Sequence, residues 1–146
     1  MTADKNATPG ITVTTLDHLR LTGVVEAFER RGQGELVEAL AEELDRAEIV
    51  APEAAPADLV TMHSRCRFAS SSGEEREVTL VYPGEEDVEQ GRISIVTPVG
   101  SALLGLRVGQ SISFAGADGH SRALTLKAVT WQPEAEGVDV GKPGRS

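Results

Sequence analysis

Residues 49–68, Ile49-Val-Ala-Pro-Glu-Ala-Ala-Pro-Ala-Asp-Leu-Val-Thr-Met-His-Ser-Arg-Cys-Arg-Phe68, divide the sequence into two parts of different character. Before this stretch, apolar residues recur every three or four positions, which is the spacing of an amphipathic helix. From Val60 to Phe68, small or apolar residues alternate with polar ones, which is the spacing of a half-buried strand. We therefore predict a helical part, a linker over residues 52–56 and a β-rich part.

The helical part predicts two antiparallel helices. The first begins after a capping pair, Thr14-Thr15, and carries an apolar stripe from Leu21 to Phe28. The second begins near Glu35, and the turn Arg31-Gly32-Gln33-Gly34 separates the two. Helices joined by so short a turn form a hairpin, here over residues 14–51. At about 1.5 Å per residue, each arm of roughly 16 residues would be about 24 Å long.

The β-rich part covers residues 57–134 and has no long helical pattern. Thr97–Leu106 predicts a turn followed by a short helix, and Asp118-Gly119 predicts a hairpin turn. The apolar phase changes between Leu126 and Val129, which indicates a β-bulge. Strands with a single short helix indicate an α+β fold with an antiparallel sheet. The five predicted strands are centred on Val60–Phe68, Val78–Tyr82, Ile93–Ile95, Ile112–Phe114 and Leu124–Trp131.

Composition narrows the class of protein. The 146 residues have a net charge of −9, which argues against direct specific binding to DNA, because nucleic-acid binders present a basic face. No apolar run is long enough to span a membrane, and the N-terminus lacks the apolar core of a signal peptide. The single cysteine excludes an intrachain disulfide and suits a reducing compartment. We therefore expect a cytoplasmic protein with a flexible leader (1–13) and a flexible tail (135–146).

Residues that could support catalysis or bind a metal do not form a recognisable site. Cys66 lies on the apolar side of its predicted strand, where a buried structural role is expected. His63 would lie on the other side, so the two would not share a metal ion. Gly100–Gly105 has the glycine spacing of a phosphate loop, but Leu106-Arg107 follows where lysine and serine or threonine are required. The acidic run Glu85–Glu89 is expected to be solvated. We expect no catalytic residue, metal or cofactor.

Several stretches resemble a known family. Ile93-Ser-Ile-Val-Thr-Pro-Val-Gly-Ser-Ala-Leu-Leu-Gly-Leu-Arg-Val-Gly109 resembles the C-terminal signature of the Gre transcription elongation factors. The resemblance covers roughly residues 35–134, with the motifs in the same order and spacing. The stretches that look like the Rnk-type branch, known as regulators of nucleoside diphosphate kinase, are Glu43–Ala47, Leu59–Arg65, Glu77–Pro83 and Trp131–Glu134.

The resemblance implies a short N-terminal coiled coil followed by an FKBP-like domain. In Gre-type factors the C-terminal domain docks on RNA polymerase at the rim of its secondary channel, and the coiled coil points inward. Carried over, the docking surface would include Thr97, Pro98, Val99 and Gly100. Proline would offer its ring for a hydrophobic contact, and glycine would permit close approach of the partner's backbone. The alternative is that these residues only shape a strand-to-helix turn.

The predicted hairpin tip departs from the family members that stimulate transcript cleavage. Those members carry an Asp-x-x-Glu pair at the tip, which helps to bind a second magnesium ion at the polymerase active centre. Here the tip is Glu29-Arg-Arg-Gly-Gln-Gly-Glu35, with arginines where acids would be needed. We therefore expect a monomeric, non-enzymatic regulator that binds RNA polymerase without stimulating cleavage, and that affects nucleoside diphosphate kinase indirectly. The alternative is an FKBP-like peptide-binding module or prolyl isomerase, which would need a pocket lined by Phe68, Tyr82, Phe114 and Trp131.

Overall fold

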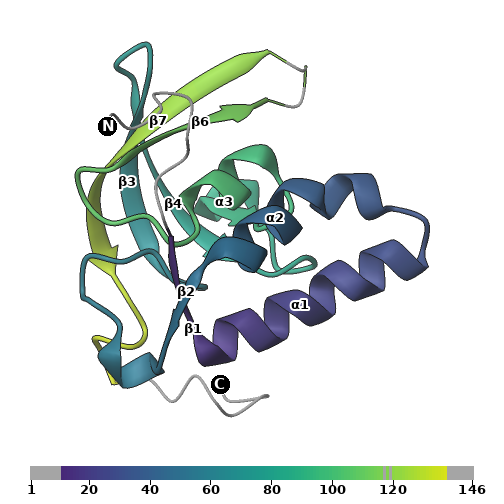
Figure 1. The fold of residues 1–146 in the computed structure, drawn as a ribbon. Helices are drawn as coiled ribbons and strands as arrows, with labels where there is room; N and C mark the ends of the chain where they lie inside the picture. The colour runs from purple at the N-terminus through teal and green to yellow at the C-terminus, as the bar shows by residue number, and fades with distance from the viewer. Residues whose placement is uncertain (1–10, 117, 119, 138–146) are drawn as a thin grey trace, which may run out of the picture.

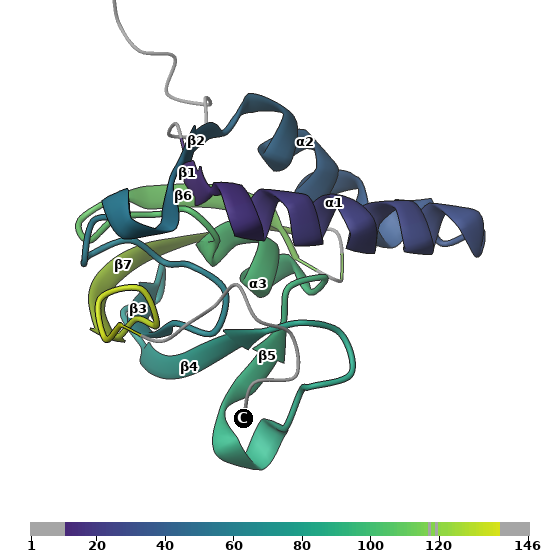
Figure 2. The same cartoon turned by 90° about the horizontal axis from the view of Figure 1, so that it is seen from below.

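A helical hairpin projects from one side of a five-stranded sheet, and a short helix, α3 (Pro98–Leu103), lies between them (Figures 1 and 2). The computed structural model describes residues 11–116, 118 and 120–137. The predicted α+β class is confirmed, with the hairpin first and the sheet second. The FKBP-like character of the sheet part stays a prediction.

The hairpin consists of α1 (Thr15–Arg30) and α2 (Glu38–Arg46), joined by a turn that ends in the 3-10 helix η1 (Gly34–Val37). The predicted cap of α1 is confirmed, because the Thr14 hydroxyl accepts a hydrogen bond from the Asp17 N–H at 3.1 Å. The second arm is shorter than predicted: its first residues form η1, and no side chain caps either η1 or α2. The α1 arm has 16 residues, which corresponds to about 24 Å.

A small parallel sheet closes the base of the hairpin, which the sequence pattern did not predict. It pairs β1 (Thr12–Thr14), just before α1, with β2 (Glu48–Val50), just after α2. Ile11 and Val13, which the sequence placed in the leader, are buried. Ile11 packs against Gly105, whose positive φ of 81° and lack of a side chain leave room for this contact.

The main sheet contains β3 (Arg65–Ser70), β4 (Glu75–Val81), β5 (Arg92–Ser94), β6 (Ser111–Ala115) and β7 (Ser121–Trp131). Its strand order is β5-β4-β3-β7-β6. Three of its four pairings are antiparallel, as predicted. β6 and β7 form the predicted hairpin, with Asp118 in the connection and Gly119 outside the described residues. The pairing of β4 with β5 is parallel, so the wholly antiparallel sheet was wrong at this edge. The reason is the connection after β4, which contains the 3-10 helix η3 (Val88–Gln90) and brings the chain back beside Thr79, so that β5 runs in the same direction as the last residues of β4.

Two details of the sheet test the predicted alternation. The bulge in β7 is confirmed, because the register against β3 shifts between the pairs Phe68↔Leu126 and Cys66↔Val129. The first predicted strand is wrong before Arg65, where β3 begins. The preceding residues, which follow the 3-10 helix η2 (Pro52–Ala54), form a buried turn that places even Thr61 in the interior.

The hairpin and the sheet share one apolar core. Leu21 of α1 and Leu40 of α2 are fully buried in the same cluster as Leu103 of α3, and Leu80 and Leu126 contribute from the sheet. α3 (Pro98–Leu103) therefore connects both parts through its apolar side chains. Among the described residues, none of the helices combines the length and the apolar character that crossing a membrane requires.

Candidate partner-binding surface

The four residues predicted to dock on a partner form the start of α3. Thr97 is the N-cap: its hydroxyl accepts from the Gly100 N–H at 3.0 Å and donates to the Ser94 carbonyl oxygen at 2.7 Å. Pro98 occupies the first turn, where a proline needs no hydrogen-bond partner for its nitrogen. Thr97, Pro98 and Val99 are half-buried. The predicted turn is thus a capped helix start that presents these side chains from a fixed backbone.

Gly100 is needed for an internal reason. It is buried, and a Cβ atom there would collide with the Ser94 carbonyl oxygen and lie 3.0 Å from the Thr97 Oγ1 atom. The glycine therefore permits close approach of the chain's own backbone, which is the alternative that the sequence analysis left open for this residue. A partner contact at Thr97, Pro98, Val99 and Gly100 stays a prediction.

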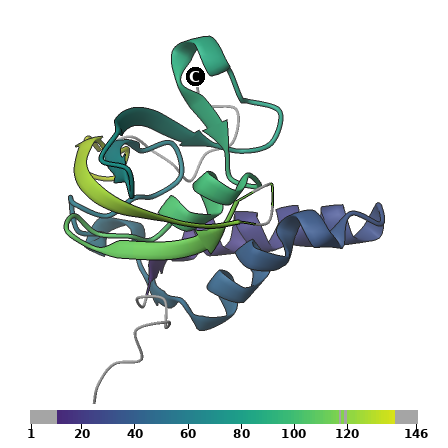
Figure 3. The ribbon, with the colours of Figure 1, turned by 90° about the horizontal axis from the view of Figure 1, so that it is seen from above.

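The hairpin tip lies far from the sheet at the free end of α1 (Figures 1 and 3). Arg31, Gly32 and Gln33 are exposed, Gly34 is half-buried, and Gly32 makes the turn with a φ of 76°. The Arg31 guanidinium carbon lies 4.6 Å from the centre of the Phe28 ring, so a cation–π contact holds this arginine in place. The turn between the two arms therefore carries positive charge.

A groove of about 750 Å³ lies on the sheet face turned away from α3, and sequence reasoning missed it. Thr79, Val81 and Trp131 line it from the strands, while the loop after β4 covers one side. Arg65 gave a signal, because it alternates with the buried Cys66. Trp131 gave none, because it shares the phase of the core-packed Val129 and a second register shift turns it outward, and the loop that completes the groove follows no pattern.

Prolyl isomerase activity would need an aromatic pocket, which this groove does not provide. Of the four aromatic residues named for such a pocket, the groove contains Trp131 alone. Phe68 is buried, and Tyr82 and Phe114 pack against the core. Nothing in the described residues favours the hypothesis that the protein is an FKBP-like prolyl isomerase.

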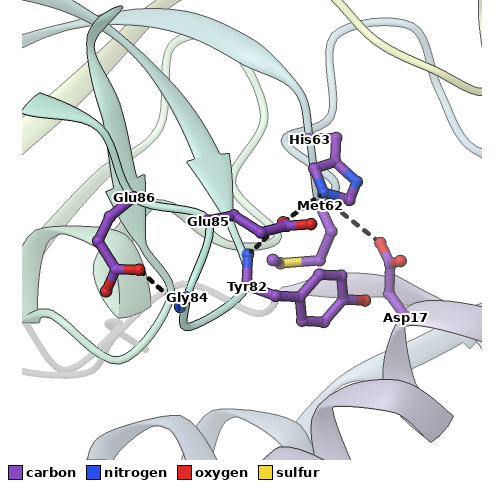
Figure 4. Close-up of polar contacts among 7 residues, drawn as sticks. All are labelled: Asp17, Met62, His63, Tyr82, Gly84, Glu85 and Glu86. Carbon is purple, nitrogen blue, oxygen red and sulfur yellow. Dashed lines mark hydrogen bonds and ion pairs between the residues drawn. The ribbon is translucent and has the colours of Figure 1, made fainter. Parts of the chain in front are cut away.

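A polar cluster joins α1 to the edge of this groove (Figure 4). Asp17 is only 4% exposed, and its Oδ2 atom accepts a hydrogen bond from the Met62 N–H at 3.0 Å. Burial raises the pKa of Asp17 to about 6, because removal from water penalises the charged form more than the Met62 hydrogen bond favours it. No pattern in the sequence marks this site, because an aspartate in the first turn of a helix is common.

The cluster continues from His63 to Glu85. The His63 Nε2 atom lies 2.9 Å from the Glu85 carboxylate, which also accepts from the Tyr82 N–H at 3.1 Å. Partial burial opposes the charge of Glu85, but these hydrogen bonds prevail and lower its pKa. Glu85 is exposed, as expected for the acidic run, and it also belongs to this connected arrangement.

Cys66 has the buried structural role that the sequence predicted. It is fully buried, and burial, together with the charge of Glu77, raises the pKa of its thiol to about 12. Within the part of the chain that the structure describes, no three histidine, cysteine or acidic side chains are grouped as metal ligands.

Comparison with known families matches each part of the chain separately. Residues 55–130, which contain the sheet and α3, match the model described as "Transcription elongation factor, GreA/GreB, C-term". Residues 9–50, which contain the hairpin, match the model described as "Rnk N-terminus". The chain belongs to the GreA/GreB family, in its Rnk branch.

Individual relatives agree with this assignment. The chain is 42% identical over 130 residues to the regulator of nucleoside diphosphate kinase of Escherichia coli K12, covering 88% of this chain and 95% of the relative. It is 47% identical over 58 residues to the transcription elongation factor GreA of Sinorhizobium medicae, covering 40% of this chain and 36% of that one. A solved GreA/GreB-type elongation factor from Nitrosomonas europaea is 40% identical, with a TM-score of 0.65 over 85% of this chain and all of that one.

Proposed function

We propose that this protein binds RNA polymerase at the rim of the secondary channel and regulates transcription elongation. The observation that carries the proposal is the combination, in one chain, of a GreA/GreB-type sheet part with a short Rnk-type hairpin. Because the hairpin and sheet share an apolar core, docking of the sheet part would also set the direction of the hairpin.

The proposed contact is the start of α3. The Thr97 cap holds the helix start in place, so Pro98 and Val99 meet the partner without a large loss of backbone freedom. Both side chains are half-buried and apolar, which suits a small hydrophobic contact surrounded by polar groups. Gly100 is buried, and its proposed role is to support this surface through its close approach to the Ser94 backbone.

The hairpin is proposed to occupy the channel entrance without stimulating transcript cleavage. Arg30 and Arg31 occupy the end of α1, where paired carboxylates would be needed to hold a magnesium ion. The α1 arm of about 24 Å also limits how far the tip extends from the docked sheet. Any effect on nucleoside diphosphate kinase would then follow from altered transcription, because the proposal includes no contact with the kinase.

Binding to purified core polymerase tests the docking surface. Pro98→Asp places a charge in the contact, while an acidic residue in the first turn of a helix is compatible with the helix dipole, so the fold should survive. The matched control is Val88→Asp, which adds the same charge at a valine that is 90% exposed on another loop. We expect Pro98→Asp to weaken binding at least tenfold and Val88→Asp to leave it unchanged.

Two results would count against the proposal. Equal affinity of the Pro98→Asp variant and the unaltered protein would remove the start of α3 as the contact. Cleavage of backtracked RNA above the level of polymerase alone would contradict the argument from the tip arginines.

A further inference from the structure

Asp17 makes a polar contact between the hairpin and a turn of the sheet part (Figure 4). It lies in the first turn of α1 and accepts from the Met62 N–H, 45 positions away along the chain. The surrounding contacts between the two parts are largely apolar, because the shared core is built mainly from leucine and valine. The position of this buried carboxylate therefore bears directly on residues Thr61–Ser64.

The turn Thr61–Ser64 is backbone-strained and held on several sides. His63 has a φ of 69°, a left-handed conformation that costs energy for a residue with a side chain. Its N–H donates to the Leu80 carbonyl at 2.6 Å, and the Ser64 carbonyl accepts from the Leu80 N–H at 3.1 Å. Strain of this kind persists only where neighbouring contacts impose it, and the Asp17–Met62 bond is one of them.

The His63 side chain connects this turn to the edge of the groove. The imidazole bonds to Glu85 and packs edge-on against the Tyr82 ring, with ring centres 5.5 Å apart. Glu85 lines the groove and accepts from the Tyr82 N–H. A shift of the turn would therefore also change the position of the groove edge.

Four ionisable groups act on Asp17, and they come from α1, the Thr61–Ser64 turn, the end of β4 and the segment after β7. Glu134, beyond β7, adds negative charge, and its Oε1 atom accepts from the Thr61 hydroxyl at 2.7 Å, so the turn lies between two carboxylates. His63 in the turn and Arg20 on α1 favour the charged form, but burial outweighs them and the pKa of Asp17 rises to about 6. Tyr82 on the remaining side has its own pKa raised by burial and by Asp17.

We propose that Asp17 makes a proton-sensitive contact that links the hairpin to the groove edge. Ionised Asp17 binds the Met62 N–H as a charged acceptor, which is a stronger contact than a neutral carboxyl can make. Protonation removes the charge of Asp17, which weakens this hydrogen bond and ends the repulsion from Glu134. The turn and the Glu85 end of the loop then change position together relative to α1. This device goes beyond polymerase binding, and it can be tested on the isolated protein.

The test follows backbone amide resonances of the full chain by NMR between pH 4.5 and 7.5. The Met62 amide is expected to shift with a midpoint near 6, and the Tyr82 and Glu85 amides are expected to show a component with the same midpoint. In Asp17→Asn the amide oxygen still accepts from Met62 but cannot titrate, so this component should disappear. His63 is retained in that variant, so a pH-dependent component that remains there does not come from Asp17.

Glu134→Gln provides a second test that keeps Asp17 intact. Removing the neighbouring negative charge should lower the midpoint of the Met62 amide, because Glu134 raises the pKa of Asp17. Glu26→Gln, at an exposed position of α1, should leave the midpoint unchanged. The proposal is overturned if the Met62 amide does not titrate, if it titrates identically in Asp17→Asn, or if Tyr82 and Glu85 fail to follow it.

Discussion

Replacing Gly100 with alanine would test the internal role of the glycine at the start of α3. The added methyl group would collide with the Ser94 carbonyl oxygen and lie 3.0 Å from the Thr97 Oγ1 atom and 3.1 Å from the Ile95 Cα atom. Two of these neighbours are backbone atoms, and the third makes the helix cap. None of them can move aside as a flexible side-chain end would.

The loss of unfolding free energy caused by Gly100→Ala can be estimated from these contacts. Inserting a methyl group into a packed interior costs about 1–3 kcal/mol, and disturbing the Thr97 cap adds about 1 kcal/mol. Alanine returns at most about 1 kcal/mol through its higher helix propensity. The expected loss is therefore about 2 kcal/mol of unfolding free energy.

Gly23→Ala is the matched control, because the same methyl group meets no atom within 4 Å on α1. There only helix propensity acts, and the variant should gain about 0.5–1 kcal/mol. Urea denaturation of both variants at one pH, with unchanged slopes, measures the difference. If Gly100→Ala proved as stable as the unaltered protein, the close approach to Ser94 would not explain this glycine, and a partner contact would again be its best explanation.

Two further predictions concern buried titratable groups. The pKa of Asp17 rises on folding from 3.8 to about 6, so between these pH values the folded state binds a proton that the unfolded state has lost. The contribution of Asp17 to the free energy of unfolding therefore falls by about 3 kcal/mol as the pH rises through this range. Asp17→Asn should therefore have a smaller loss of stability between pH 4 and 7, measured by urea denaturation, and an unchanged pH slope would refute this reasoning. Cys66 should react with a thiol reagent at least about 100-fold more slowly in the folded protein than in urea, because its thiol is buried and hard to ionise; equal rates would contradict its burial.

Local patterns were sufficient where neighbouring residues decide the structure. The hairpin, the Thr14 cap, the short helix α3 and the β7 bulge were predicted from spacing and capping chemistry, and the structure confirms them. The family signature over residues 93–109 also led to the Gre resemblance, and the family comparison confirms it. Contact of Thr97, Pro98 and Val99 with a partner stays a prediction, because a docking surface is shown only by the partner.

The sequence by itself therefore determined the division into a helical and a β-rich part, the class of fold and the family. Tertiary structure alone decided the parallel pairs β1–β2 and β4–β5. β1, β2 and β5 have three residues each, which is too short to carry a period, and the direction of a pairing depends on the path of the chain that connects the strands. It also decided the burial of Asp17 and Thr61, polar residues that enter the interior only because distant groups satisfy their hydrogen bonds. Such contacts depend on where the folded chain brings its segments together, which no local spacing records.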